Sequence, residues 1–172
     1  MKKLLIVVDM QKDFVDGSLG SNEAMSVVDN VVKEIEGFQG DIIVTMDTHY
    51  PDYERTLEGK YLPVVHCIKD TSGWMLDEKV RTALDKKRCE TLEKVTFGSV
   101  YLPKLVAEKY QPCEIELIGL CTDICVISNA LLLRAFFPNT EISVKADCCA
   151  GVTPEKHEAA LEVMRSCQIN II

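Results

Sequence analysis

The sequence has no long apolar run and no excess of basic residues, and each absence excludes a class of protein. None of its apolar stretches approaches the roughly 20 residues that a membrane-spanning helix requires. The longest candidate, residues 130–137, is interrupted by Arg134. The formal net charge is −8 and no basic patch is visible, so nucleic-acid binding is not expected. We therefore expect neither a membrane nor a nucleic acid as a partner.

The CxxC pairs typical of zinc ribbons are also missing, although the chain has eight cysteines. No secretory leader is expected, because Asp9 ends the apolar run that follows Met1-Lys2-Lys3 and no small-residue cleavage site comes after it. A cytoplasmic location with reduced thiols is therefore predicted. Most of the cysteines are then expected to act as small buried apolar side chains.

The apolar pattern predicts strands that alternate with helices. Strands are expected at residues 4–8, 42–46, 91–95, 114–120, 141–145 and 169–172. Helices are expected at about 22–38, 76–86, 100–110, 122–137 and 154–167, with a long loop over 47–73. Repeated βα units indicate an α/β fold. We expect a six-stranded, mainly parallel sheet with helices on both faces, a Rossmann-like three-layer arrangement in a single domain over residues 1–172.

Polar or reactive groups follow four of the predicted strands, at the ends where parallel sheets bind ligands. These groups are Asp9, Asp47, Lys94 and the turn 121–125. Taken singly, each has an ordinary explanation, since aspartate often starts turns and a lysine at a strand end is usually solvated. Their convergence on one edge of the sheet is the physical evidence for a site.

The turn 121–125 offers a cysteine at each end, where a helix begins. The positive end of a helix dipole stabilises a thiolate, and backbone N–H groups there can form an oxyanion hole. These arguments do not choose between Cys121 and Cys125 as a nucleophile. Asp9 is a candidate general base, and Lys94 would lower the pKa of a neighbouring thiol and keep Asp9 ionised.

Asp47, His49 and His66 form a further candidate group, on and near the long loop. Carboxylate and imidazole groups suit a divalent ion such as Zn²⁺, Mn²⁺ or Fe²⁺. Glu54 and Glu58 are both candidates for another ligand. The remaining histidine, His157, lies in a polar helix and is expected to be solvated.

The order of these motifs resembles that of the isochorismatase-like cysteine hydrolases, and among them the nicotinamidases. The resemblance rests on residues 6–14, on residues 119–126, on Asp47-x-His49 with His66-Cys67, and on residues 147–161. It implies that Cys125 is the nucleophile, with Asp9 as base and Lys94 as their cationic partner. It further implies an oxyanion hole made by the N–H groups of Cys121 and Cys125, after a cis peptide bond at Leu120–Cys121.

The resemblance also implies the activity of a cysteine amidohydrolase on a small primary amide, with nicotinamide converted to nicotinate and ammonia in NAD salvage. Zinc is the expected metal, with manganese or iron as alternatives, and Glu58 is favoured over Glu54 as its ligand. Phe14, Leu62 and Trp74 are expected to bind the substrate, with Tyr61 as a further aromatic candidate. A homo-oligomer, either a dimer or a tetramer, is expected. The alternatives are hydrolysis of another small amide, ureido or carbamoyl compound, and a catalytically silent binding protein.

Overall fold

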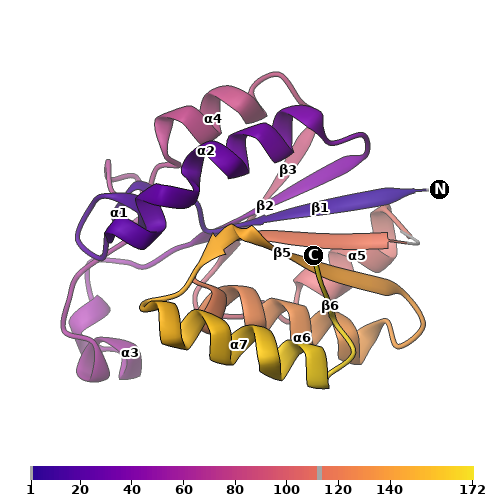
Figure 1. Cartoon of the computed structure of the whole chain (residues 1–172). Coiled ribbons are helices and arrows are strands. Elements are labelled where there is room, and N and C mark those ends of the chain that lie inside the picture. Colours follow the sequence, from indigo (N-terminus) through magenta and orange to yellow (C-terminus); the bar gives the residue numbers. More distant parts are fainter. Residues whose placement is uncertain (1, 112–113) are drawn as a thin grey trace.

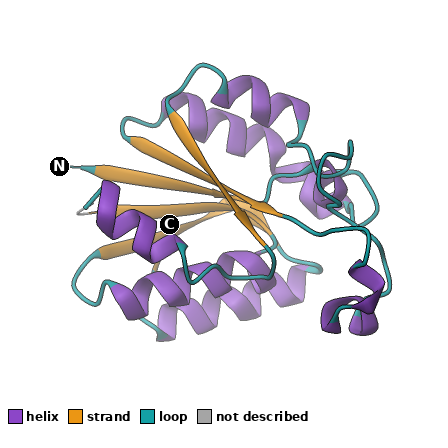
Figure 2. Ribbon diagram, turned by 180° about the vertical axis from the view of Figure 1, so that it is seen from behind, coloured by secondary structure: helices purple, strands orange, loops and turns teal. Residues whose placement is uncertain are grey.

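The computed structural model describes residues 2–111 and 114–172, which form one twisted sheet between two layers of helices (Figures 1 and 2). The strands are β1 (Lys3–Val8), β2 (Asp41–Asp47), β3 (Cys89–Lys94), β4 (Glu114–Leu120), β5 (Glu141–Ala150) and β6 (Asn170–Ile171). They lie in the order β3-β2-β1-β4-β5-β6, and every neighbouring pair is parallel. The predicted six-stranded α/β sheet is confirmed, and it is wholly parallel.

Helices cover both faces of the sheet (Figure 1). On one face lie α2 (Asn22–Gly37) and α4 (Glu78–Leu84), and on the other α5 (Leu102–Lys109), α6 (Ile127–Phe136) and α7 (Pro154–Ser166). The central strand β1 serves both layers. Leu5 and Val7 belong to the core with α2 and α4, whereas Leu4 and Ile6 belong to the core with α5, α6 and α7. Side chains of a strand alternate between faces, so a strand covered on both faces is apolar throughout.

Two elements differ from the sequence prediction. Strand β5 continues to Ala150 rather than ending at residue 145, because Cys149 and Ala150 pair with Gly119 and Leu120 after a shift in register. The helix expected from residue 122 opens with a π-helical turn, η2 (Thr122–Val126), before α6 begins. Such turns are rare and occur frequently at functional sites.

The long loop expected over residues 47–73 contains short helical segments. They are a 3₁₀ turn, η1 (Tyr53–Arg55), and the helix α3 (Leu57–Tyr61). The helix begins at its cap residue Thr56, whose side chain accepts a hydrogen bond from the N–H of Gly59. Another short helix, α1 (Lys12–Val15), follows β1. Figure 1 shows α1 and α3 beyond the carboxyl ends of the strands, where they enclose the edge that carries the predicted site.

Residues 2–111 and 114–172 contain no helix with both the length and the apolar character needed to cross a membrane. The seven cysteines among these residues are all free thiols, and Cys113 lies outside the described residues. Cys67, Cys125, Cys148 and Cys149 are buried. Cys89 is exposed and Cys121 and Cys167 are half-buried, so four of the seven described cysteines lie in the interior, and one of the four is the predicted nucleophile Cys125.

Candidate active site

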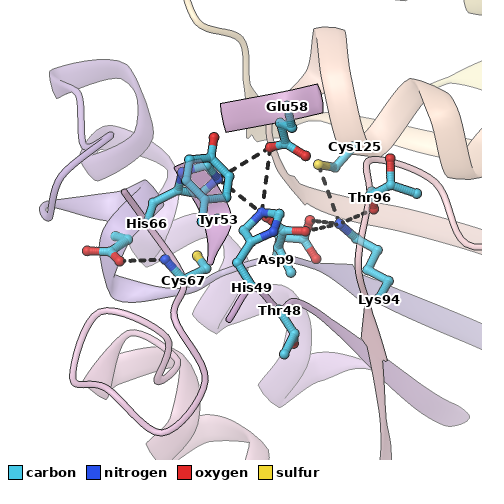
Figure 3. Close-up of polar contacts among 12 residues, drawn as sticks. Asp9, Thr48, His49, Tyr53, Glu58, His66, Cys67, Lys94, Thr96 and Cys125 are labelled. Carbon is cyan, nitrogen blue, oxygen red and sulfur yellow. Dashed lines mark hydrogen bonds and ion pairs between the residues drawn. The ribbon is translucent and has the colours of Figure 1, made fainter. Parts of the chain in front are cut away.

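Asp9, Lys94 and Cys125 meet at the carboxyl edge of the sheet (Figure 3). The ammonium nitrogen of Lys94 lies 2.6 Å from Oδ2 of Asp9 and 3.6 Å from Sγ of Cys125. It also donates a hydrogen bond of 3.0 Å to the carbonyl oxygen of Thr96. Asp9 is 0% exposed, Lys94 4% and Cys125 5%. The fold thus brings the three predicted catalytic residues from distant segments into one buried contact.

Asp9 has an unusual backbone conformation that aims its carboxylate. Its φ of 48° lies in the left-handed region, which aspartate tolerates better than most residues. Oδ1 accepts a hydrogen bond of 2.7 Å from the Thr45 hydroxyl, and the Asp9 N–H donates to the Thr45 carbonyl. One carboxylate oxygen is therefore fixed by the neighbouring strand β2, and the other faces Lys94.

The electrostatics of this group keep Lys94 charged and raise the pKa of both Asp9 and Cys125. Burial raises the pKa of the Cys125 thiol well above its ordinary value; Asp9 raises it further and Lys94 opposes the rise. Burial also raises the pKa of Asp9, against the attraction of Lys94. Burial disfavours the charge of Lys94 itself, but the surrounding Asp9, Cys125 and Asp47 together outweigh that cost and raise the pKa of Lys94. The ammonium therefore stays charged, while the acid and the thiol compete for a proton.

The turn that carries Cys125 depends on a close approach of two strands. Gly119 has a φ of +119°, and a Cβ at this position would lie 2.1 Å from the carbonyl oxygen of Val8. Only glycine fits there. The peptide bond between Leu120 and Cys121 is cis, as predicted. Cys125 then follows in the first turn after β4.

Two buried polar contacts support this turn and were missed in the sequence. The Asn129 side chain donates 2.8 Å to the Cys125 carbonyl and accepts 3.0 Å from the Ser99 N–H. A lone asparagine in a strongly apolar helix was the available signal. His157, expected to be solvated, is half-buried, and its Nδ1 lies 2.7 Å from the hydroxyl oxygen of the buried Thr122. The solvated assignment was wrong, because the start of α7 packs against η2.

A second group contains the predicted metal ligands Asp47, His49, Glu58 and His66. One ligand atom from each lies within 4.8 Å of the others. Oε1 of Glu58 is 3.5 Å from Nε2 of His49 and 3.6 Å from Nε2 of His66 (Figure 3). Glu54 is exposed and stands outside this group. The fold therefore brings in Glu58, the glutamate that the resemblance favoured, and leaves out the alternative Glu54.

This group is suited to a divalent cation. Burial disfavours the charged form of His49 and His66, but the carboxylates of Asp47 and Glu58 outweigh it and raise the pKa of each imidazole to about 9. The same two carboxylates would also stabilise a metal cation, which the imidazoles bind in their neutral form. Nδ1 of His66 lies 2.8 Å from the Val64 carbonyl, which favours the tautomer that leaves Nε2 for a metal. Two imidazoles and two carboxylates are a donor set that zinc accepts.

Tyr53, which was not singled out in the sequence, supports both imidazoles. Its ring centroid lies 4.7 Å from that of His49 and 5.0 Å from that of His66. The tyrosine is 1% exposed, and its hydroxyl donates 2.9 Å to the carbonyl oxygen of Leu62. It therefore holds the two ligands against the segment that follows α3.

Asp47 belongs to both groups. Its Oδ1 lies 3.3 Å from the ammonium of Lys94, and its Oδ2 lies 3.0 Å from Nε2 of His49. Burial alone would raise the pKa of this carboxyl, but His49, His66 and Lys94 hold it well below its usual range. The ionised carboxylate of Asp47 therefore connects the candidate metal-binding group to the cluster of Asp9, Lys94 and Cys125.

A cavity of about 560 Å³ opens beside both groups. Its lining includes Cys121, Cys125, Asp47, Glu58, His66, Phe14 and Leu62. The Phe14 ring centroid lies 5.5 Å from that of His66. The nucleophile candidate, three of the candidate metal ligands and several apolar side chains therefore line the same cavity.

Trp74, which was predicted to bind the substrate, does not line this cavity. Its indole N–H donates 2.9 Å to the hydroxyl of Thr48, which holds the ring on the loop instead. Tyr61, the other aromatic candidate, is 84% exposed and also lies outside the cavity lining. Of the predicted substrate-binding residues, the structure brings Phe14 and Leu62 to the cavity.

Known proteins resemble this chain over nearly its whole length. The family model described as Isochorismatase domain matches residues 3–172. An uncharacterized isochorismatase family protein, PncA, of Bacillus subtilis (strain 168) is 30% identical over 174 residues, covering 94% of this chain and 93% of the relative. The crystal structure of nicotinamidase/pyrazinamidase PncA from Bacillus subtilis superposes with a TM-score of 0.88 at 28% identity, covering 99% of each chain. That of the pyrazinamidase of Pyrococcus horikoshii in complex with zinc superposes with a TM-score of 0.83 at 26% identity, covering 100% of this chain and 99% of the other.

Proposed function

The chain belongs to the isochorismatase family, and from that premise we propose that it is a cysteine amidohydrolase that converts nicotinamide to nicotinate and ammonia. The observation that carries the proposal is the Lys94 ammonium, buried in contact with both Asp9 and Cys125 at a cavity. The names nicotinamidase and pyrazinamidase among the similar structures support the choice of substrate. Nicotinate is the product that returns to NAD, so the activity belongs to NAD salvage.

Acylation begins with transfer of the Cys125 thiol proton to the Asp9 carboxylate, while Lys94 offsets the negative charge. The thiolate attacks the amide carbonyl carbon and forms the C–S bond. The N–H groups of Cys121 and Cys125 stabilise the resulting oxyanion. Asp9 then gives its proton to the amide nitrogen, the C–N bond breaks, and ammonia leaves.

Deacylation uses the same residues in the opposite direction. Asp9 takes a proton from a water molecule, and the hydroxide attacks the thioester carbonyl carbon. Collapse of the oxyanion breaks the C–S bond, and Cys125 recovers the proton from Asp9. The carboxylic acid product is released, and the site returns to its starting charge.

Asp47, His49, Glu58 and His66 would hold a divalent ion, which we propose to be zinc. Manganese and iron suit the same donors. When bound, the ion supplies a Lewis acid that orients a ring nitrogen or activates water. Phe14, beside His66, supplies an aromatic face for the pyridine ring, and Leu62 supplies apolar surface. The zinc in the similar Pyrococcus horikoshii structure supports this choice of metal.

We further propose that the protein acts in the cytoplasm, as a single-domain subunit of a homo-oligomer that is a dimer or a tetramer. The seven described cysteines carry no disulfide bond, which suits a reducing compartment. Leu57, Tyr61 and Phe97 are large exposed apolar side chains that line one surface pocket together, and exposed apolar patches often mark subunit contacts. Light scattering after size-exclusion chromatography measures the oligomeric state.

Ammonia release from a panel of amides tests the activity. The panel contains nicotinamide, pyrazinamide, one ureido compound and one carbamoyl compound, each offered to zinc-loaded protein and to Cys125→Ala. A Cys167→Ala variant serves as the control for loss of a cysteine remote from the cavity. We expect the highest kcat/KM for nicotinamide. Release from only the ureido or carbamoyl compound would reassign the substrate, and no release from any of them would favour a binding protein.

A further inference from the structure

The segment after β1 carries polar side chains at alternate positions, Asp9, Gln11 and Asp13. The mechanism uses only the first of them. We infer that Gln11 and Asp13 are positioning residues that hold the metal-binding group in its ligand geometry. This inference rests on the metal-binding part of the proposed function.

Gln11 fixes the backbone of Asp47 from both sides. Its side chain is fully buried, and Oε1 accepts a hydrogen bond of 2.7 Å from the Asp47 N–H. Nε2 donates 2.8 Å to the Asp47 carbonyl and 2.9 Å to the Trp74 carbonyl. The residue whose carboxylate joins Lys94 to the metal-binding group therefore has little rotational freedom in its backbone.

Asp13 fixes the backbone next to His66. Its Oδ2 accepts a hydrogen bond of 2.8 Å from the N–H of Cys67, which Figure 3 shows at the Cys67 nitrogen. Cys67 has a φ of 46°, so a residue in a left-handed conformation directly follows the ligand. A Cβ at Gly73 would lie 2.2 Å from Oδ2 of Asp13, so glycine is needed for the close approach of this carboxylate.

Backbone hydrogen bonds of the same segment also hold the end of the loop that carries the candidate metal ligands His49, Glu58 and His66. The N–H of Lys12 donates 2.8 Å to the Met75 carbonyl, and the N–H of Asp13 donates 3.0 Å to the Gly73 carbonyl. These bonds do not depend on the side chains of Gln11 and Asp13. Substitution of either side chain should therefore loosen the ligands while the loop stays attached.

The expected consequence is weaker metal binding rather than unfolding. Residues that orient metal ligands typically contribute about 10- to 100-fold to metal affinity. Gln11→Met keeps the approximate volume but removes every hydrogen bond of the amide. Asp13→Asn retains an oxygen that can accept from the Cys67 N–H, whereas Asp13→Ala does not.

Competition with a chromophoric chelator measures the Zn²⁺ affinity of the metal-stripped full chain, and visible absorption of the Co²⁺-substituted protein reports on ligand geometry. We expect Gln11→Met and Asp13→Ala to bind Zn²⁺ about 10- to 100-fold more weakly and to change the Co²⁺ spectrum. Asp13→Asn should keep much of the wild-type Zn²⁺ affinity and much of the wild-type Co²⁺ spectrum. The matched control is Lys12→Met, which removes an exposed side chain of the same segment that pairs with Asp16. It should match the wild type.

A second control separates positioning from general loss of stability. Val31→Ala creates a defect in the buried face of α2, away from the ligands. The inference is overturned if Gln11→Met and Asp13→Ala retain wild-type affinity and spectrum, or if Val31→Ala alters both to the same degree. A wild-type chain that binds no Zn²⁺ overturns the metal-binding part of the proposed function together with the inference. Since no amide is used, an incorrect substrate leaves the test unaffected.

Discussion

Replacing Lys94 with methionine tests how the buried charges of the site depend on one another. The ammonium lies 2.6 Å from Asp9 and 3.3 Å from Asp47. With an effective dielectric constant of about 20, Coulomb's law gives roughly 6 kcal/mol for the shorter pair and roughly 5 kcal/mol for the longer. Desolvation offsets much of this, yet removal of one partner leaves carboxylates buried without a cation. We therefore expect Lys94→Met to lower the free energy of unfolding by about 3–5 kcal/mol.

Urea unfolding of chelator-treated protein, followed by circular dichroism, measures this change. Asp9→Asn in the Lys94→Met background removes one of the unpaired carboxylates, so the double variant should lose less stability than the two single variants added together. Lys79→Met is the matched surface control, because its 2.8 Å ion pair with Asp29 is 66% and 71% exposed. Such a pair contributes about 0–1 kcal/mol.

Alkylation of Cys125 gives an independent measure on the same proteins. Without the ammonium, burial and Asp9 oppose thiolate formation with nothing to counter them, so reaction with iodoacetamide should slow. A Lys94→Met variant that loses no more stability than Lys79→Met, shows additive behaviour with Asp9→Asn and alkylates at the wild-type rate would refute the reasoning.

Three further predictions concern the thiols and the metal-binding group. Cys125→Ala should abolish ammonia release, and an active alanine variant would contradict this. Peptide mass spectrometry should find Cys125 alkylated before Cys121, because the Lys94 ammonium that stabilises a thiolate lies 3.6 Å from Sγ of Cys125. His49→Ala should purify with less zinc than the wild type by elemental analysis, and equal contents would argue against the site. In metal-free protein the imidazoles of His49 and His66 have a pKa of about 9, above their ordinary value of 6.5, so their stabilisation is complete below pH 6.5 and is lost as the pH rises through 9. The free energy of unfolding should fall over that range, less steeply in His66→Gln, and a flat profile would disprove the assignment.

The site also contained polar residues whose sequence signal was weak. Asn129 and Tyr53 each make contacts that only a folded chain provides, one with the Cys125 carbonyl and the other with two imidazole rings. Gln11 is similar, since its partners Asp47 and Trp74 lie 36 and 63 residues away along the chain. A hydrogen bond over such a separation leaves no periodic pattern in the sequence, so these roles could not be inferred from spacing.

The pattern of apolar runs was enough to predict the parallel sheet and the edge at which its reactive groups gather. An apolar run such as residues 4–8 has to be covered on both faces, and parallel strands direct the residues that follow them to one edge. The position of Asp9, Lys94 and Cys125 follows from that rule. Spacing alone did not choose between Glu54 and Glu58, and it did not exclude Trp74 from the cavity. The resemblance favoured Glu58, and the folded chain brings Glu58 to the other candidate ligands and leaves Trp74 outside the cavity lining. These outcomes depend on how the segment between β2 and α4 folds back. That path is held by the hydrogen bonds of Tyr53 to Leu62 and of Trp74 to Thr48, which join residues 9 and 26 positions apart and follow no short-range pattern.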